Sequence, residues 1–302
     1  MSESSDNHAW IRAMPVVFVL IWSTGFIVAR YGMPNSPPFG FLLIRYALSV
    51  LCFLLWIQWA KVAWPRGARQ WWHLAVTGVF MHAGYLGGVW AAVKGGMGSG
   101  LSALIVGVQP VLTAMWLSSR GGGHVSRRQW WGLWLGFIGL AMVVSRKLEG
   151  GIEVTPWTVS MAVMALLSIT SGTLYQKRHV EPCDVRTANT VQLMAAFVVT
   201  LPIAWVEQEA IQWNTEMMGA MAWSVLGLTL GGSSLLYILI QRGAAAAVTS
   251  LMYLVPPTTA VMAWFLFDEH ITGMTLAGIA VTAMGVSLVV RPPKAPAAQN
   301  VE

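Results

Sequence analysis

The sequence is poor in charge. Only 10% of its 302 residues are Asp, Glu, Lys or Arg, against about a quarter in an ordinary soluble domain. A soluble chain of this length would form about two domains, and so few charges cannot cover their surfaces. Disorder is excluded as well, because disordered chains are polar and this one is 56% hydrophobic. The composition therefore predicts an integral membrane protein.

Cysteine is nearly absent too. The only two, Cys52 and Cys183, exclude a disulfide scaffold and lack the spacing of metal ligands, so we expect no metal and no cofactor. The net charge is +6, but the basic residues are scattered singly or in small groups. That scatter argues against nucleic acid as a partner.

Apolar runs of about 20 residues, the length that crosses a bilayer as a helix, occur ten times. The runs are continuous, which favours helices over the short alternating strands of a membrane barrel. The first run lacks the small-residue cleavage site of a signal peptide, so we expect it to be retained. The ten expected helices cover approximately 14–33, 38–58, 72–93, 99–118, 129–146, 156–176, 187–206, 218–240, 246–267 and 272–290.

The connections between these runs carry Lys and Arg mainly on one side of the membrane. Cytoplasmic loops are enriched in Lys and Arg, so the richer side is expected to be cytoplasmic, with both chain termini on it. The poorer side holds Arg30, Lys94, Arg146 and Lys147. The richer side holds Arg12, Lys61, Arg66, Arg69, Arg120, Arg127, Arg128, Lys177, Arg178, Arg186, Arg242, Arg291 and Lys294.

The chain also repeats itself. A shift of 146 residues lays 99–146 on 245–292 without a gap, and Pro110 then falls on Pro256. A shift of 147 residues lays the first and second runs on the sixth and seventh, and Arg45 falls on Gln192.

This register predicts two five-helix repeats, residues 1–147 and 156–291, followed by a polar tail, 292–302. Five crossings is an odd number, so the two repeats enter the membrane in opposite directions. Inverted repeats of this kind are typical of secondary transporters.

Short motifs at matching places carry a family resemblance. They are Trp22-Ser-Thr-Gly-Phe26, Phe41-Leu-Leu-Ile-Arg45, Ala92-Val-Lys94-Gly95, Gln109-Pro110 and Phe267-Asp-Glu269. Over residues 14–291 the chain resembles the drug/metabolite transporter superfamily, EamA type. The resemblance implies a ten-helix carrier of the bacterial inner membrane, for cargo that ranges from amino acids to sugars and nucleotide sugars. The first repeat departs from the pattern, with Gly121-Gly122-Gly123 where the family often has an acidic turn.

Arg45 lies about seven residues into the second expected helix. A central Arg costs roughly 2.5–3.5 kcal/mol on insertion scales, so it should face protein or water rather than lipid. One interpretation is a binding group for a carboxylate or phosphate on the substrate. The other is an Arg that packs between helices or extends to the interface.

His82 lies near the middle of the third helix, with Tyr85 and Val89 on the same face. No Asp or Glu lies deep in any of the ten runs, so His82 is the deep side chain able to titrate near neutral pH. It is the candidate for proton coupling, and the alternative is a neutral His that hydrogen-bonds a neighbouring helix.

Proline marks the fourth and ninth helices, where it removes a backbone donor and frees a carbonyl. We expect Pro110, Pro256 and Pro257 to kink these helices and to act as bending points, although such kinks are also common in packed membrane helices. Tyr253 aligns with Gly107 and is expected to make the cavity asymmetric.

Other polar or aromatic residues of the expected helices complete the candidate substrate site. Any single Ser or Thr among them can instead bond back to its own helix. They are Trp22, Ser23, Gln109, Thr170, Ser171, Gln192, Ser234 and Tyr237. Glycine faces on the fifth and tenth helices, which include Gly139 and Gly285, are assigned to scaffold or homodimer packing.

These features favour a secondary carrier that moves a small organic molecule outward, such as an amino acid or similar amphipathic metabolite, by alternating access. A nucleotide-sugar or sugar carrier would need several inward Lys or Arg, and a multidrug exporter of cations would need a deep carboxylate. A channel, whose flux would not saturate, is a further alternative. An intramembrane enzyme would need a nucleophile–base pair or metal ligands at depth, and we expect no catalytic residue.

Overall fold

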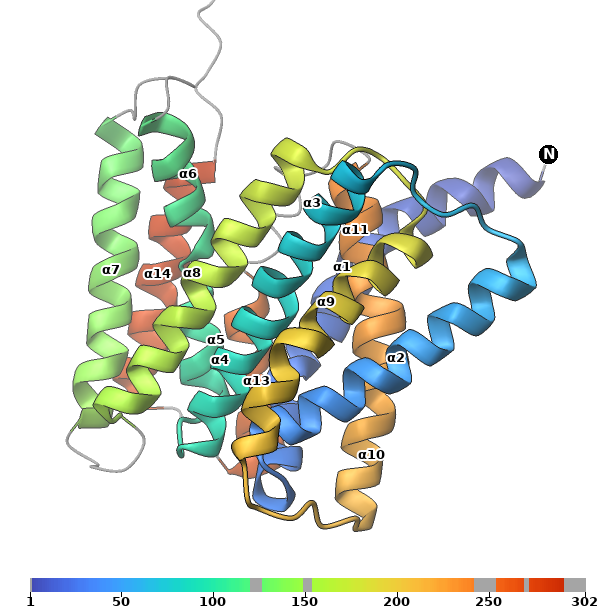
Figure 1. The fold of residues 1–302 in the computed structure, drawn as a ribbon. Helices are drawn as coiled ribbons and strands as arrows, with labels where there is room; N and C mark the ends of the chain where they lie inside the picture. The colour runs from blue at the N-terminus through green and yellow to red at the C-terminus, as the bar shows by residue number, and fades with distance from the viewer. Residues whose placement is uncertain (1, 120–126, 149–153, 242–253, 269–271, 291–302) are drawn as a thin grey trace, which may run out of the picture.

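The computed structural model describes residues 2–119, 127–148, 154–241, 254–268 and 272–290 (Figure 1). These residues form helices and no strand, so the predicted all-helical class is confirmed. The elements are α1 (Ser2–Gly32), η1 (Met33–Asn35), α2 (Pro38–Ala60), α3 (Ala68–Gly78), η2 (Val79–Gly84), α4 (Tyr85–Lys94), α5 (Ser99–Val106), α6 (Gln109–Ser119), α7 (Arg127–Leu148), α8 (Pro156–His179), α9 (Val185–Val206), α10 (Thr215–Trp223), η3 (Ser224–Ser233), α11 (Ser234–Gln241), α13 (Val255–Phe267) and α14 (Gly273–Val290).

Six helical stretches among the described residues are long and apolar enough to cross a bilayer. They are Val16–Asn35, Pro38–Ala60, Ala68–Lys94, Pro156–His179, Val185–Val206 and Thr215–Leu239. Shorter apolar helices cover Ser99–Thr113, Val255–Phe267 and Gly273–Gly285. The bounds of the six long stretches agree with six of the ten expected runs to within a few residues.

Polar residues at the connections start the long helices. Thr155 and Thr158 form a capping box at the start of α8, in which each side chain bonds the other residue's backbone N–H. Asn214 caps α10 by accepting a hydrogen bond from the backbone N of Met217 at 2.8 Å. Such caps satisfy the N–H groups that a first helical turn leaves unpaired.

The third helix of each half contains a wider turn. In the first half α3, η2 and α4 form one continuous helix, and η2 is π-helical. In the second half the π-helical η3 joins α10 to α11 in the same way. The repeat shift of 147 moves 79–84 onto 226–231, inside η3. π-Helical turns are rare and occur mostly at functional sites.

Prolines lie near the start of a helix in both the fourth and the ninth expected segments. The fourth is interrupted at 107–108, directly before Pro110, and divides into α5 and α6. Pro256 and Pro257 lie in the first turn of α13, where a missing backbone N–H leaves no hydrogen bond unmade. Residues 246–253 of the expected ninth helix lie outside the described residues, so the kink at Pro256 and Pro257 stays a prediction.

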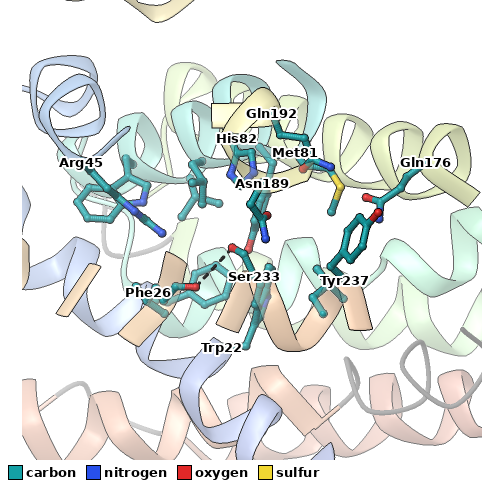
Figure 2. Close-up of a pocket in the computed structure, with 17 residues that line it drawn as sticks. Trp22, Phe26, Arg45, Met81, His82, Gln176, Asn189, Gln192, Ser233 and Tyr237 are labelled. Carbon is teal, nitrogen blue, oxygen red and sulfur yellow. Dashed lines mark hydrogen bonds between the residues drawn. The ribbon is translucent and has the colours of Figure 1, made fainter. Parts of the chain in front are cut away.

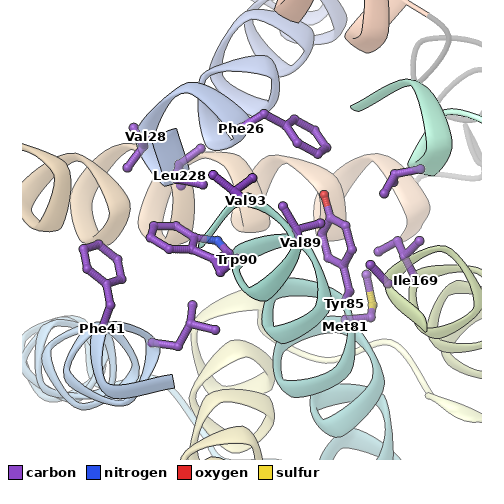
Figure 3. Packing of buried hydrophobic residues seen from close by; sticks show 14 of the residues in the cluster. Phe26, Val28, Phe41, Met81, Tyr85, Val89, Trp90, Val93, Ile169 and Leu228 are labelled. Carbon is purple, nitrogen blue, oxygen red and sulfur yellow. The ribbon is translucent and has the colours of Figure 1, made fainter. Parts of the chain in front are cut away.

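The main hydrophobic core lies among α1, α2, α4, α9 and η3. Trp90 is almost fully buried there and stacks on Phe41 with 4.3 Å between ring centroids (Figure 3). Gly78 lets α3 touch α9, since a Cβ on it would lie 2.1 Å from the carbonyl oxygen of Gln192. This close crossing fixes the position of the α9 side chains that the next section describes.

The helices α7 and α14 pack side by side at one edge of the molecule (Figure 1). A Cβ on Gly139 would lie 2.5 Å from the carbonyl oxygen of Gly278, and a Cβ on Gly285 would lie 2.5 Å from that of Gly132. The glycine faces read from the sequence therefore serve packing within the chain, where small residues allow two membrane helices to approach closely.

Candidate functional site

A buried cavity lies between the two halves of the sequence (Figure 2). Its volume is about 50 Å³, room for a few water molecules. The lining residues come from α1, α2, η2, α4, α8, α9, η3 and α11. They are Trp22, Gly25, Phe26, Arg45, Met81, His82, Tyr85, Leu86, Val89, Trp90, Gln176, Asn189, Gln192, Leu228, Ser233, Leu236 and Tyr237.

Arg45 lies at one end of this cavity (Figure 2). It is 4% exposed, and its Nε donates a hydrogen bond to Thr229 Oγ1 at 3.1 Å. The guanidinium carbon lies 6.0 Å from the ring centroid of Trp90, within the range of a cation–π contact. None of the ion pairs among the described residues involves Arg45, so its charge is buried without a carboxylate partner.

The two amides of α9 face the same cavity. Asn189 and Gln192 are three residues apart, which places them on one face of the helix, and they are 2% and 3% exposed. Neither Asn189 Nδ2 nor Gln192 Nε2 has a hydrogen-bond partner. Buried polar atoms are nearly always paired, so these two donors point to a ligand or to water in the cavity.

His82 occupies the π-helical turn η2. Its carbonyl accepts a hydrogen bond from the Tyr46 hydroxyl at 2.9 Å, and its side chain lines the cavity together with Gln192. The helix face predicted to carry His82, Tyr85 and Val89 does line the cavity.

Aromatic rings form much of the remaining wall. Trp22 and Tyr85 lie nearly parallel, at 4° and with 6.3 Å between ring centroids. At the opposite end from Arg45, the Tyr237 hydroxyl lies 3.1 Å from Cys183 Sγ (Figure 2). Flat apolar walls of this kind suit a substrate with a planar or hydrophobic body.

Several predicted site residues lie elsewhere. Ser23 is fully buried and donates to the carbonyl of Val19 in its own helix, and Ser234 is buried outside the lining. Gln109 lines a small side chamber of about 10 Å³ behind Trp22 and Tyr85. Tyr253 lies outside the described residues.

Thr170 and Ser171 line a different space, a groove of about 660 Å³ between α6 and α8. The prediction that Thr170 and Ser171 line the central cavity is therefore wrong, because both lie on another face of α8. Near this groove the Tyr175 hydroxyl lies 2.8 Å from Nδ1 of His73.

The sequence interpretation missed Asn189, Gln176, Ser233, Met81, Trp90 and Phe26 among the lining residues. Asn189 could have been identified from the sequence, because it precedes Gln192 by three residues and so lies on the same helix face. The apolar members had none, since nothing distinguishes a Phe that lines a cavity from one in the core.

Polar contacts join the two halves at the end of the molecule that carries few Lys and Arg. The Glu207 carboxylate accepts hydrogen bonds from the backbone N of Phe39 at 3.1 Å and of Gly40 at 2.7 Å, at the start of α2. Burial raises the pKa of Glu207, against the lowering effect of these two bonds. Lys94 pairs with Glu209 in an ion pair at the same end. Charge-assisted bonds therefore hold this end closed.

The other end is joined by neutral groups. The Gln70 side chain donates to the carbonyl of Glu181 at 2.8 Å and accepts from the backbone N of Glu181 at 3.1 Å. Asp184 caps α9 nearby, and its hydrogen bonds from Arg186 lower the pKa of the Asp184 carboxyl. Neutral hydrogen bonds are weaker than charge-assisted ones, so the described bonds between Gln70 and Glu181 are weaker individually than those of Glu207 and Lys94.

Comparison with known proteins supports a transport function. A model of the "EamA-like transporter family" matches the chain twice, at residues 10–145 and 156–291. An "Uncharacterized transporter YvbV" of Bacillus subtilis is 25% identical and covers 90% of this chain and 88% of its own length. An "Uncharacterized inner membrane transporter YedA" of Escherichia coli K12 is 25% identical over 88% and 84%.

Two further similarities extend the comparison. A "Probable amino-acid metabolite efflux pump" of Salmonella typhimurium is 22% identical over 90% of this chain and 92% of its own. A solved structure titled "Crystal structure of protein" shares the fold, with a TM-score of 0.66 and 15% identity over 91% of this chain and 95% of that one. Because the two family matches cover most of the sequence, the chain belongs to the EamA-like transporter family, as an integral membrane protein and a transporter.

Proposed function

We propose that the protein is a secondary carrier that exports a small amphipathic organic molecule, such as an amino acid or similar metabolite, across the bacterial inner membrane. The observation that carries the proposal is the cavity between the two halves, lined by polar groups unsuited to a lipid environment. Family and relatives add support, among them one named as an amino-acid metabolite efflux pump.

The transport cycle that we propose is alternating access by two inverted five-helix repeats within a ten-helix protein. The aligned positions Arg45 and Gln192 both reach the cavity, and the π-helical turns η2 and η3 occupy equivalent places beside it. These turns and the interruption before Pro110 are the bending elements of the proposal. Both termini and the end joined by neutral bonds face the cytoplasm in this proposal.

The rival cargo classes are less well supported. Within the described part of the chain, Arg45 is the only Lys or Arg that lines the cavity, whereas several would suit the phosphates of a nucleotide sugar. None of the described Asp and Glu side chains lines it to pair with a cationic drug. An amphipathic cargo fits the aromatic walls and the few amides better than either alternative.

The test is uptake into liposomes that contain the purified protein, across a panel of amino acids and related metabolites, with and without a pH gradient. The proposal predicts saturable uptake of at least one member, inhibited by excess unlabelled substrate. Uptake that rises linearly with concentration would indicate a channel instead, and turnover of a substrate would indicate an enzyme.

A further inference from the structure

We infer that the cavity selects an organic anion, a carboxylate on a planar or aromatic body, over the same body as a zwitterion or a cation. The inference rests on the proposed carrier function and narrows its substrate class. It depends on three features of the cavity, namely an unneutralised guanidinium, two unpaired amide donors and the absence of any acid from the lining.

The first feature is the uncompensated charge of Arg45. Removing an ion from water costs several kcal/mol, and an opposite charge recovers that loss only when it lies close. Among the residues that the structure describes, no Asp or Glu lines the cavity. In the second half of the chain, Asp184 is paired with Arg186 and Glu207 with backbone N–H groups. The counter-ion of Arg45 is therefore best supplied by the substrate.

The second feature is the direction of the free hydrogen bonds. Thr229 accepts from Nε of Arg45, which leaves both terminal nitrogens of the guanidinium for a ligand. The Nδ2 of Asn189 and the Nε2 of Gln192 are also unpaired donors. A buried donor without a partner destabilises the fold. A carboxylate has two oxygens with about four acceptor sites, so it accepts several hydrogen bonds of the kind that these side chains offer.

The third feature concerns what an ammonium group would meet. Aromatic faces and amide oxygens are available to it, but no carboxylate is, and Arg45 would repel it in a medium of low dielectric constant. The stacked pair Trp22 and Tyr85 offers a flat wall to an uncharged body instead. The cavity should therefore bind the anion, the zwitterion and the cation of one molecular body with different affinities, because of their charge.

The test is equilibrium binding of 3-phenylpropionate, phenylalanine and phenethylamine to the full chain in detergent. These three probes share a phenyl ring and a chain of similar length, and they are an anion, a zwitterion and a cation at neutral pH. We expect 3-phenylpropionate to bind about tenfold or more tightly than phenylalanine, and phenethylamine to show no measurable binding.

Single substitutions test which side chains produce the preference for the anion. Arg45→Gln should reduce the ratio between the anion and the zwitterion to about one, and Asn189→Leu should weaken 3-phenylpropionate about fivefold or more. Ser49→Ala is the matched control, because its hydroxyl is also buried and unpaired but does not line the cavity, and it should change no affinity. Thermal melting of each variant shows whether it is folded.

Equal or tighter binding of phenethylamine would overturn the inference, and so would a preference that survives Arg45→Gln or no binding of any of the three probes. Other outcomes test the proposed carrier function independently of the anion site. If 3-phenylpropionate binds as expected and is never moved across a liposome membrane, the anion site stands and the proposed function is wrong. If the protein transports only amines or sugars, the function stands and the anion site is wrong.

Discussion

The central cavity and the seam between α7 and α14, at one edge of the molecule (Figure 1), both bring helices together, but they bury different groups. Around the cavity, Arg45 has no ion-pair partner among the described residues and Asn189 and Gln192 keep unpaired donors. In the α7–α14 pair, glycines bring backbones together and the Thr282 hydroxyl donates to the carbonyl of Gly278 at 2.8 Å.

The difference separates function from stability. Unsatisfied polar groups destabilise a fold, so those at the cavity are best explained by a ligand. A satisfied, closely packed helix pair needs no ligand to explain it. Substitutions at the cavity should therefore change transport more than stability. Substitutions between α7 and α14 should change stability more than transport.

The largest effect is expected at Arg45. Arg45→Gln should lower transport of anionic cargo by about a hundredfold or more, and transport of zwitterionic cargo by less, because it removes the main attraction for a carboxylate. Stability should be unchanged or slightly raised, since an unpaired buried charge is removed. Liposome uptake and thermal melting measure the two effects, with the exposed Lys61→Gln as control. Normal transport by Arg45→Gln would remove Arg45 from the site.

The converse is expected in the α7–α14 pair. In Gly139→Ala the new methyl would meet backbone at 2.5 Å, so stability should fall by about 1–3 kcal/mol, as in other overpacked sites. Substrate affinity in the folded fraction should not change. Gly136→Ala is the control on the same helix, because its Cβ would meet only Val111 Cγ2, at 3.9 Å. Equal stability of the two variants would show that the close approach is unimportant.

A smaller effect is expected at His82. If a proton drives export, His82→Gln should abolish the dependence of uptake on a pH gradient and change uptake without a gradient by less than about tenfold. Tyr85→Phe, on the same face, should keep the dependence. The comparison of uptake with and without a gradient tests this, and coupling that persists in His82→Gln would assign the proton elsewhere.

The smallest effect is expected at Asp184, outside both regions. Its pKa is lower in the folded protein than in the unfolded chain because Arg186 bonds the carboxylate. The stabilisation is therefore present above the unfolded pKa and is lost as the pH falls through the folded pKa. Since the pair is partly exposed, it contributes at most about 1 kcal/mol. Melting at several acidic pH values should show a shallower loss in Asp184→Asn, and an identical loss would contradict this role.

Much of the fold could be read from the sequence because membrane helices leave a clear signal. Runs of apolar residues near 20 long predicted the six long spans within a few residues. The same runs could not predict the π-helical turns η2 and η3, because the choice between α- and π-helical bonding depends on tertiary contacts. One such contact is the bond from the Tyr46 hydroxyl to the carbonyl of His82.

The site was predictable only in part. Arg45, His82, Tyr85 and Gln192 stood out because polar groups within apolar spans need a reason, and all four line the cavity. Helix rotation was harder to predict. Thr170 is as polar as Asn189, but it faces the groove between α6 and α8, and only the packing of α8 against its neighbours decides that.

The central claim is that two halves of opposite orientation enclose one cavity, and single-cysteine labelling tests it most directly. Lys61 follows α2, Gln208 stands 147 residues later, after α9, and both are exposed. In a chain without Cys52 and Cys183, Lys61→Cys should react with an impermeant reagent only from the cytoplasmic side, and Gln208→Cys only from the opposite side. Reaction of both cysteines from the same side would contradict the inverted arrangement.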